Sequence, residues 1–146
     1  MPEEPRFSAA EVDIVLHATE DQEKVLAAVE KALGVSATDF AGEQAEGHFG
    51  NRIVLMKATV ASKDAGALAA KIMSSLNRPD RQELADHIGE YSDDKGNLYL
   101  RLDKQRICQG RVSLAESDAV RVRFRPVRRY RPSGNVETYR GLLSLG

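Results

Sequence analysis

The chain contains few of the residues on which metal and disulfide chemistry depend. Cys108 is the single cysteine, so no intramolecular disulfide can form, and a reducing cytoplasm is the expected location. The three histidines lie in separate segments, and none falls at a metal-ligand spacing. The chain has no tryptophan and only four Phe and four Tyr, which argues against a large aromatic ligand pocket. We therefore expect no metal ion and no cofactor.

Long apolar runs and nucleotide-binding motifs are missing as well. No apolar run approaches the roughly 18 residues of a membrane span, and residues 1–13 are acidic without an apolar signal core. Neither a GKT nor a GxGxxG pattern occurs. The carboxylates of Glu20 and Asp21 are better explained by a charged helix start, capped by Thr19, than by acid–base chemistry. These absences predict a protein that is not an enzyme and does not bind membranes.

Charge is abundant and unevenly distributed along the chain. The net charge is −1, but residues 1–96 carry 10 Lys+Arg and 18 Asp+Glu, whereas residues 97–146 carry 11 and 4. The first part therefore has a net charge of −8 and the second part +7. Such asymmetry points to a nucleic acid or another acidic partner. The alternative is that the two parts neutralise each other within the fold or across a homodimer.

The most basic segment covers residues 120–131, which read VRVRFRPVRRYR. Apolar residues first occupy every second position, a period of two that predicts a strand with one apolar and one cationic face. Side chains on one face of a strand lie about 7 Å apart. A row of guanidiniums beside a tyrosine suits a phosphate backbone with bases to stack on. The arginines that we predict to bind RNA here are Arg121, Arg123, Arg125, Arg128, Arg129 and Arg131.

A second amphipathic strand is predicted at residues 98–103, where leucines alternate with polar residues. This alternation places Tyr99, as a stacking side chain, on the same face as Arg101. Just beyond the strand, Lys104 is expected to reach a phosphate and Gln105 a base edge. Asp103 is expected to accept hydrogen bonds from local donors instead.

A further stacking candidate is His48, in a glycine-rich loop at residues 47–51. The alternative there is a solvated His48 beside a buried Phe49.

The order of the expected elements indicates an α+β fold, because helices and strands do not alternate regularly. Residues 104–110 are expected to form a loop or tight turn. We predict an antiparallel-dominated sheet with helices packed on one face and a polar, basic face left open. The strands are expected near residues 12–16, 52–60, 98–102 and 119–127, and the helices near 20–33, 65–76 and 79–89.

The expected domain organisation is simple. Residues 1–9 are expected to be a disordered lead, residues 10–127 a single α+β domain, and residues 128–146 a basic C-terminal extension over the surface.

Three motifs occur in a fixed order: ATEDQEKV at residues 18–25, GHFGN at 47–51 and LYLRLDKQ at 98–105. Together they resemble a group of small archaeal proteins described as predicted RNA-binding proteins or predicted exosome subunits. The resemblance covers roughly residues 10–127, and its most specific element is Asp-Lys-Gln at 103–105. Where the family has small apolar residues after this element, the chain has Arg-Ile-Cys at 106–108. The resemblance implies RNA association without catalysis, a link to the exosome or to RNA-processing proteins, and a fold like that of the large-subunit ribosomal protein that binds 5S ribosomal RNA.

The sequence thus predicts a cytoplasmic, non-catalytic RNA-binding protein that contacts the phosphate backbone through a basic sheet face. The alternative is a protein-interaction or assembly subunit, in which acidic and basic halves pair between copies or with a partner. Arginines paired with Glu20, Asp21, Glu23 or Glu30 would favour that alternative.

Overall fold

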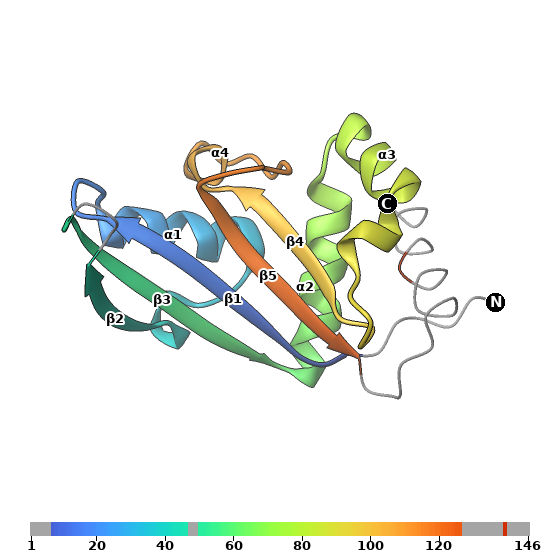
Figure 1. Ribbon diagram of the computed structural model, residues 1–146, viewed down its shortest axis with the longest axis horizontal. Helices are drawn as coiled ribbons and strands as arrows, with labels where there is room; N and C mark the ends of the chain where they lie inside the picture. The colour runs from blue at the N-terminus through green and yellow to red at the C-terminus, as the bar shows by residue number, and fades with distance from the viewer. Residues whose placement is uncertain (1–6, 47–49, 127–138, 140–146) are drawn as a thin grey trace.

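The computed structural model describes residues 7–46, 50–126 and 139 (Figure 1). Within these ranges, five antiparallel strands form one sheet in the order β2-β3-β1-β5-β4. The strands are β1 (Phe7–His17), β2 (Ala41–Glu46), β3 (Arg52–Ala61), β4 (Leu98–Asp103) and β5 (Ala119–Pro126). Their arrangement confirms the α+β fold with an antiparallel sheet.

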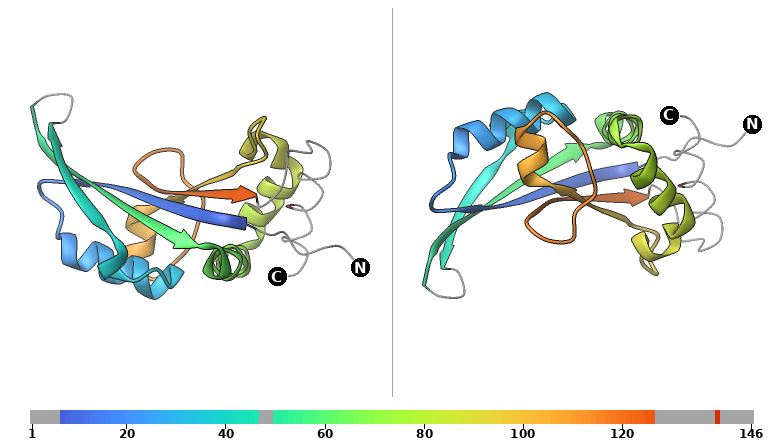
Figure 2. Two further views of the ribbon diagram at one scale, coloured as in Figure 1. Left: turned by 90° about the horizontal axis from the view of Figure 1, so that it is seen from below. Right: turned by 90° about the horizontal axis from the view of Figure 1, so that it is seen from above.

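Four α-helices accompany the sheet in the same ranges. Figures 1 and 2 show α1 and α2 on one face of the sheet, whereas no helix of the described part lies on the other face. None of these helices is both long and apolar enough to cross a membrane. The helices are α1 (Gln22–Leu33), α2 (Ser62–Ser75), α3 (Arg78–Asp86) and α4 (Lys104–Cys108), with short 3-10 helices at Ala37–Asp39 and Ile88–Tyr91.

The central strand β1 explains why the sheet has one apolar and one polar face. Val12 and Ile14 are buried under the helices, while Glu11 and Asp13, which alternate with them, point to the open face. Val12 lies opposite Val122 of β5, so the apolar faces of the two strands coincide. This register also places the polar residues of neighbouring strands side by side on the open face.

Helix α1 ends as the sequence predicts but begins at a different residue. Gly34 adopts a left-handed conformation (φ 79°), and its N–H donates to the carbonyl of Glu30. The N-cap is Asp21, whose side chain accepts from the N–H of Lys24, so the prediction of Thr19 as the cap is wrong. Glu20, which lies between Thr19 and Asp21, instead accepts a hydrogen bond from Lys104 at the start of α4.

Other elements differ from the sequence-based expectation. Residues 104–110 were expected to form a loop, but Asp103 accepts from the N–H of Arg106 and starts α4. Strand β1 already begins at Phe7, within the expected lead. In the expected C-terminal extension, Tyr139 is buried and its ring packs against Phe7, with centroids 6.0 Å apart. The apolar surface near Phe7 accounts for the burial of Tyr139.

Candidate nucleic-acid interface

The open face of β4 and β5 brings together the tyrosine and arginines predicted from the alternating patterns. In the register of these strands, Arg101 lies directly opposite Arg121, and Tyr99 directly opposite Arg123. Arg125 follows on the same face of β5. The prediction that these five side chains share one face is therefore confirmed.

The charge of this face is lower than the sequence suggests, because β1 contributes the carboxylates of Glu11 and Asp13. Glu11 lies opposite Arg123 and pairs with its guanidinium, and its other oxygen lies 2.7 Å from Nη2 of Arg125. The side chains of Arg123 and Arg125 are 32% and 50% exposed. Two of the three β5 guanidiniums therefore pair with a carboxylate of the chain itself, and their predicted roles in binding RNA stay predictions.

Two other arginines on the face, Arg101 and Arg121, make no ion pair with the described residues, although Asp13 of β1 lies opposite Arg121 in the ladder. Among the described residues, neither Arg101 nor Arg121 has a carboxylate within 4.0 Å, and both side chains are exposed. They belong to neighbouring strands and face each other across the ladder, where like charges repel. An anion bridging the two guanidiniums would relieve this repulsion.

Tyr99 supplies an aromatic surface beside the arginines. Among the residues of the described ranges, it is the large hydrophobic side chain that remains exposed, at 40%. Its hydroxyl donates to Oδ2 of Asp93 at 2.8 Å, which anchors one end of the ring. Burial acts to raise the pKa of Asp93, but hydrogen bonds from Asn97 and Tyr99 outweigh it, and the pKa is lowered. The tyrosine is thus held in place by an ionised carboxylate.

Lys104, predicted to reach a phosphate, lies instead in the interior of the protein. Its side chain has no exposed surface, and its Nζ donates to the carbonyl of Val15 at 2.8 Å. Nζ also lies 2.7 Å from Oε1 of Glu20 and 2.8 Å from Oδ1 of Asp118. Three acceptors thus satisfy the three N–H groups of the ammonium. The prediction that Lys104 faces solvent is wrong.

These contacts join two motifs that are distant in the sequence. Glu20 of the Thr-Glu-Asp motif accepts from Lys104 and, at 3.4 Å, from Nε2 of Gln105 in the Asp-Lys-Gln motif. Asp118 completes the site from a left-handed backbone conformation, with φ of 50°. In that conformation its carbonyl also accepts from the N–H of Lys104. Gln105 is exposed but engaged with Glu20, so its predicted role in reading a base stays a prediction.

Burial and pairing act in opposite directions on the ionisation of this site. Burial would raise the pKa of Glu20 and of Asp118, but hydrogen bonds from Lys104 outweigh it, and both pKa values are lowered. Burial would lower the pKa of Lys104, but its bonds to Asp118 and Glu20 raise it overall. All three groups are therefore charged near neutral pH.

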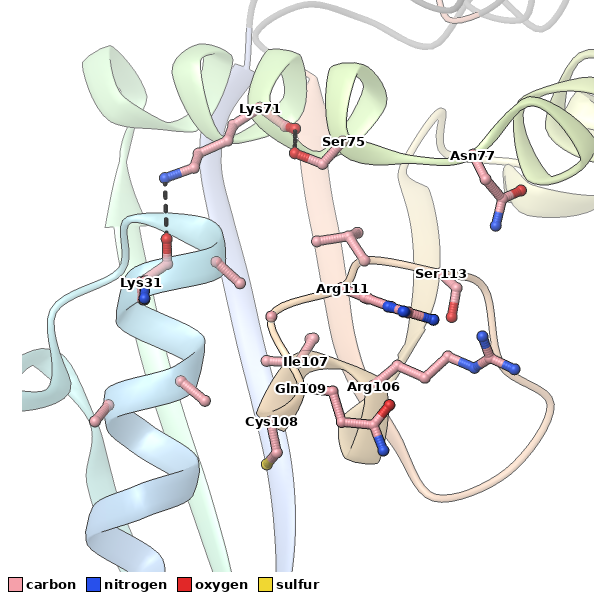
Figure 3. A pocket seen from close by; sticks show the side chains of 15 residues that line it. Lys31, Lys71, Ser75, Asn77, Arg106, Ile107, Cys108, Gln109, Arg111 and Ser113 are labelled. Atoms are coloured by element: carbon pink, nitrogen blue, oxygen red, sulfur yellow. Dashed lines mark hydrogen bonds between the residues drawn. The ribbon is translucent and has the colours of Figure 1, made fainter.

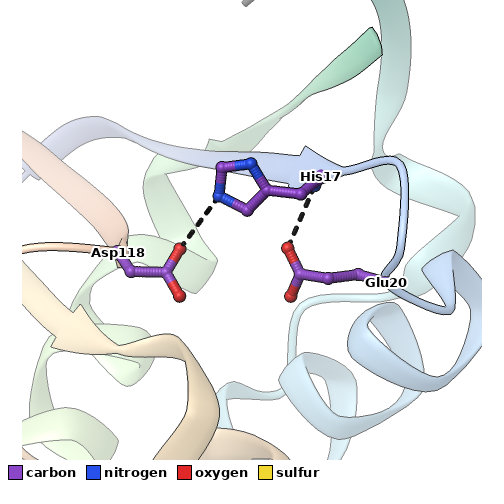
Figure 4. A group of neighbouring side chains, drawn as sticks. All are labelled: His17, Glu20 and Asp118. Atoms are coloured by element: carbon purple, nitrogen blue, oxygen red, sulfur yellow. Dashed lines mark hydrogen bonds and ion pairs between the residues drawn. The ribbon is translucent and has the colours of Figure 1, made fainter. Parts of the chain in front are cut away.

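The same carboxylates form a group with the geometry of a possible metal site. One ligand atom from each of His17, Glu20 and Asp118 falls within a span of 4.8 Å (Figure 4). The Nε2 atom of His17 lies 3.5 Å from Oδ1 of Asp118. However, the ammonium of Lys104 already contacts both carboxylates, and a metal ion would have to approach this buried positive charge. The group is better explained as the anionic side of the Lys104 site.

Several predicted RNA-binding residues lie outside the residues that the structure describes. These are His48, Arg128, Arg129 and Arg131. Their predicted roles stay predictions.

Sequence reasoning missed two residues that shape the site. Glu11 could have been found, because the alternation in Val-Asp-Ile-Val around β1 extends back to it and places it on the polar face. Asp118 could not, since it lies in an irregular segment and acts through a left-handed backbone that no local pattern of residues indicates.

Comparison with known proteins shows the family to which the chain belongs. The chain belongs to the family described as RNA binding, whose model matches residues 9–125. The chain is 34% identical over 116 residues to RNA-binding protein PAB1135 of Pyrococcus abyssi, with 75% of each chain covered. This confirms the resemblance to archaeal RNA-binding proteins, while the links to the exosome and to the ribosomal-protein fold stay predictions.

Solved archaeal structures share the fold. Mth689, a DUF54 protein from Methanothermobacter thermautotrophicus, is 26% identical with a TM-score of 0.77, covering 94% of this chain and 98% of that one. Protein AF2318 of Archaeoglobus fulgidus is also 26% identical, with a TM-score of 0.79 and coverage of 94% and 99%.

The buried ammonium makes Lys104 a stability residue. Lys104→Met should lower the free energy of unfolding at neutral pH by about 3–5 kcal/mol, because two carboxylates lose their buried partner. Urea unfolding followed by circular dichroism measures the change. The matched control is Lys57→Met on β3, where the exposed side chain has no ion pair with the described residues, and a change within about 0.5 kcal/mol is expected.

The pH dependence provides the second part of this test. The lowered pKa values of Glu20 and Asp118 stabilise the fold above their ordinary values of 4.5 and 3.8, and this contribution disappears as the pH falls through the folded values. The raised pKa of Lys104 stabilises the fold below 10.5 and ceases to do so as the pH rises through the folded value. The difference between wild type and Lys104→Met should therefore shrink in acid; a difference independent of pH would contradict this assignment.

Proposed function

We propose that the protein is a non-catalytic RNA-binding protein that contacts the phosphate backbone of single-stranded RNA through the open face of β4 and β5. The RNA-binding family to which the chain belongs supports the class of ligand. The observation that carries the location is the cross-strand pair of Arg101 and Arg121, neither of which has an ion pair with the described residues, beside exposed Tyr99.

The arginine pair suits a phosphate for two reasons. Guanidiniums donate in a planar fork that matches phosphate oxygens, and a bound phosphate would separate the two positive charges. Arg125 lies further along β5 and keeps half of its side chain exposed, so a strand of RNA could continue past it. Contacts of this kind supply affinity with little sequence preference.

Tyr99 suits a base next to these phosphates. A base stacked on an aromatic side chain contributes about 1–3 kcal/mol, whichever base it is. Because the hydroxyl of Tyr99 is held by Asp93, the ring loses little freedom on binding. The proposal therefore combines two backbone contacts with one stacked base.

The same proposal covers the activity, partners and location of the protein. In this proposal the protein has no catalytic role and acts in the cytoplasm. It associates with RNA-processing or exosome proteins, as the family resemblance implies. The assembly alternative receives less support, because Arg123 and Arg125 pair with Glu11 of their own chain. None of the described β5 arginines pairs with Glu20, Asp21, Glu23 or Glu30.

Charge reversal of the unpaired arginines tests the location. Arg101→Glu/Arg121→Glu should weaken binding of a mixed single-stranded RNA by more than about tenfold at low salt and reduce the log–log salt slope by about 1.4, since two phosphate contacts are lost. Fluorescence anisotropy at several salt concentrations measures both. The control, Lys24→Glu/Lys63→Glu, makes the same charge change on exposed residues of α1 and α2. Equal losses in the two variants would rule out this face as the binding site.

Glu11 provides a test in the opposite direction. Glu11→Gln should tighten RNA binding by about threefold to tenfold at low salt, because it removes a negative charge and releases Arg123 and Arg125. The same anisotropy assay applies, with Glu23→Gln on α1 as the control for net charge. Unchanged or weaker binding by Glu11→Gln would count against RNA on this face.

A further inference from the structure

A second positively charged surface lies on the helical side of the sheet. A pocket of about 960 Å³ opens between α1, the end of α2 and the segment that follows α4 (Figure 3). Small side chains of α1, including Ala28 and Ala32, form part of its wall and leave the space unfilled. Its size is within the range of pockets that hold a small molecule such as a nucleotide.

The lining of this pocket is cationic. Two lysines and two arginines line it, and no carboxylate of the described residues does. The four cations come from three different helices or the segment after them: Lys31 of α1, Lys71 of α2, Arg106 of α4 and Arg111. Lys71 is engaged in part, since its Nζ donates to the carbonyl of Lys31 at 3.4 Å. Figure 3 shows the two lysines toward α1 and α2 and the two arginines together at the other end of the pocket. Positive charge that lines a concave site attracts anions.

The backbone after α4 holds the two arginines together. The N–H of Arg111 donates to the carbonyl of Arg106 at 2.8 Å. The chain reverses at Gly110, which has a left-handed φ of 79°. Within the described ranges, the carboxylate nearest to either guanidinium is Asp103, 4.0 Å from Nε of Arg106. Figure 3 shows the two guanidiniums on the same side of this segment, and of the described carboxylates only Asp103 pairs with one of them.

A buried hydroxyl at the same place lacks a hydrogen-bond partner. Ser113 lines the pocket, is 6% exposed, and its Oγ makes no hydrogen bond within the described structure. Figure 3 shows its side chain on the side of the loop where Arg106 and Arg111 extend. Most buried polar groups in folded proteins have a partner, and an unsatisfied one destabilises the protein. A ligand oxygen between the arginines would accept from this hydroxyl.

We propose that this pocket binds a phosphate monoester group, held by Arg106 and Arg111 and by the hydroxyl of Ser113. The guanidiniums donate to the phosphate oxygens in pairs, and Lys31 and Lys71 add positive charge at the rim. The phosphate monoester belongs either to a free nucleotide or to the 5′ end of an RNA. The site lies on the opposite side of the sheet from Tyr99 and does not depend on RNA binding there.

Titration of the native protein with AMP and with inorganic phosphate, followed by calorimetry at low salt, tests the site. Arg106→Glu/Arg111→Glu should weaken AMP binding by at least about tenfold, the equivalent of one charged hydrogen bond. The matched control is Arg101→Glu/Arg121→Glu, which should change AMP affinity less than about twofold while RNA binding falls. These two variants separate failure of the pocket from failure of the sheet face.

Ser113→Ala distinguishes a ligand-binding from a structural role for the hydroxyl. It should weaken AMP binding by about fivefold, as expected for one hydrogen bond, while the melting temperature stays unchanged or rises, because an unsatisfied buried hydroxyl is removed. A lower melting temperature with unchanged AMP affinity would show that the hydroxyl serves the fold alone and would overturn its place in the site.

Two short RNAs that differ only in a 5′-phosphate or 5′-hydroxyl identify the source of the group. A tighter complex with the 5′-phosphate, lost in Arg106→Glu/Arg111→Glu, assigns the pocket to an RNA end. Equal binding of the two RNAs together with binding of AMP assigns it to a free nucleotide. Failure of the wild-type protein to bind AMP and inorganic phosphate at millimolar concentration, or equal binding by the pocket variant, would overturn the proposal.

Discussion

The buried ammonium of Lys104 is the interaction on which the arrangement of this protein depends most. It connects the end of β1, the turn before α1 and the residue before β5, through Val15, Glu20 and Asp118. A fully buried lysine is stable only when its charge is paired and its donors are satisfied, and here both conditions are met. The ammonium therefore fixes how α1 and α4 meet at one end of the sheet, beneath the face that carries the arginines.

The opposite charges of the two parts of the chain, residues 1–96 and 97–146, pair with each other in the fold. Glu11 and Glu20 come from the acidic part, and they pair with Arg123, Arg125 and Lys104 of the basic part. Part of the asymmetry is thus neutralised within the fold. Among the described residues, Arg101 and Arg121 on the sheet have no ion pair, and they form the part of this charge that we propose for a polyanion.

Much of the fold was predictable because local patterns and tertiary packing agree. The alternation in β4 and β5 and the helical spacing that ends at Gly34 each reflect one buried face, and the structure retains both. The site was less predictable. Lys104 comes directly after the alternating strand β4, where an exposed side chain is expected, yet it is buried. The partners that stabilise its charge lie 84 residues upstream and 14 residues downstream. Such long-range pairing leaves no periodic signal in a single sequence.

The most direct test of the account is to map where RNA touches the native protein. Ultraviolet cross-linking of a mixed single-stranded RNA with a 5′-hydroxyl, followed by mass spectrometry of the linked peptides, identifies the contact surface without any substitution. The account predicts adducts on the peptides of β4 and β5, with Tyr99 as a linked side chain. Adducts confined to α1, α2 and α3 would contradict it.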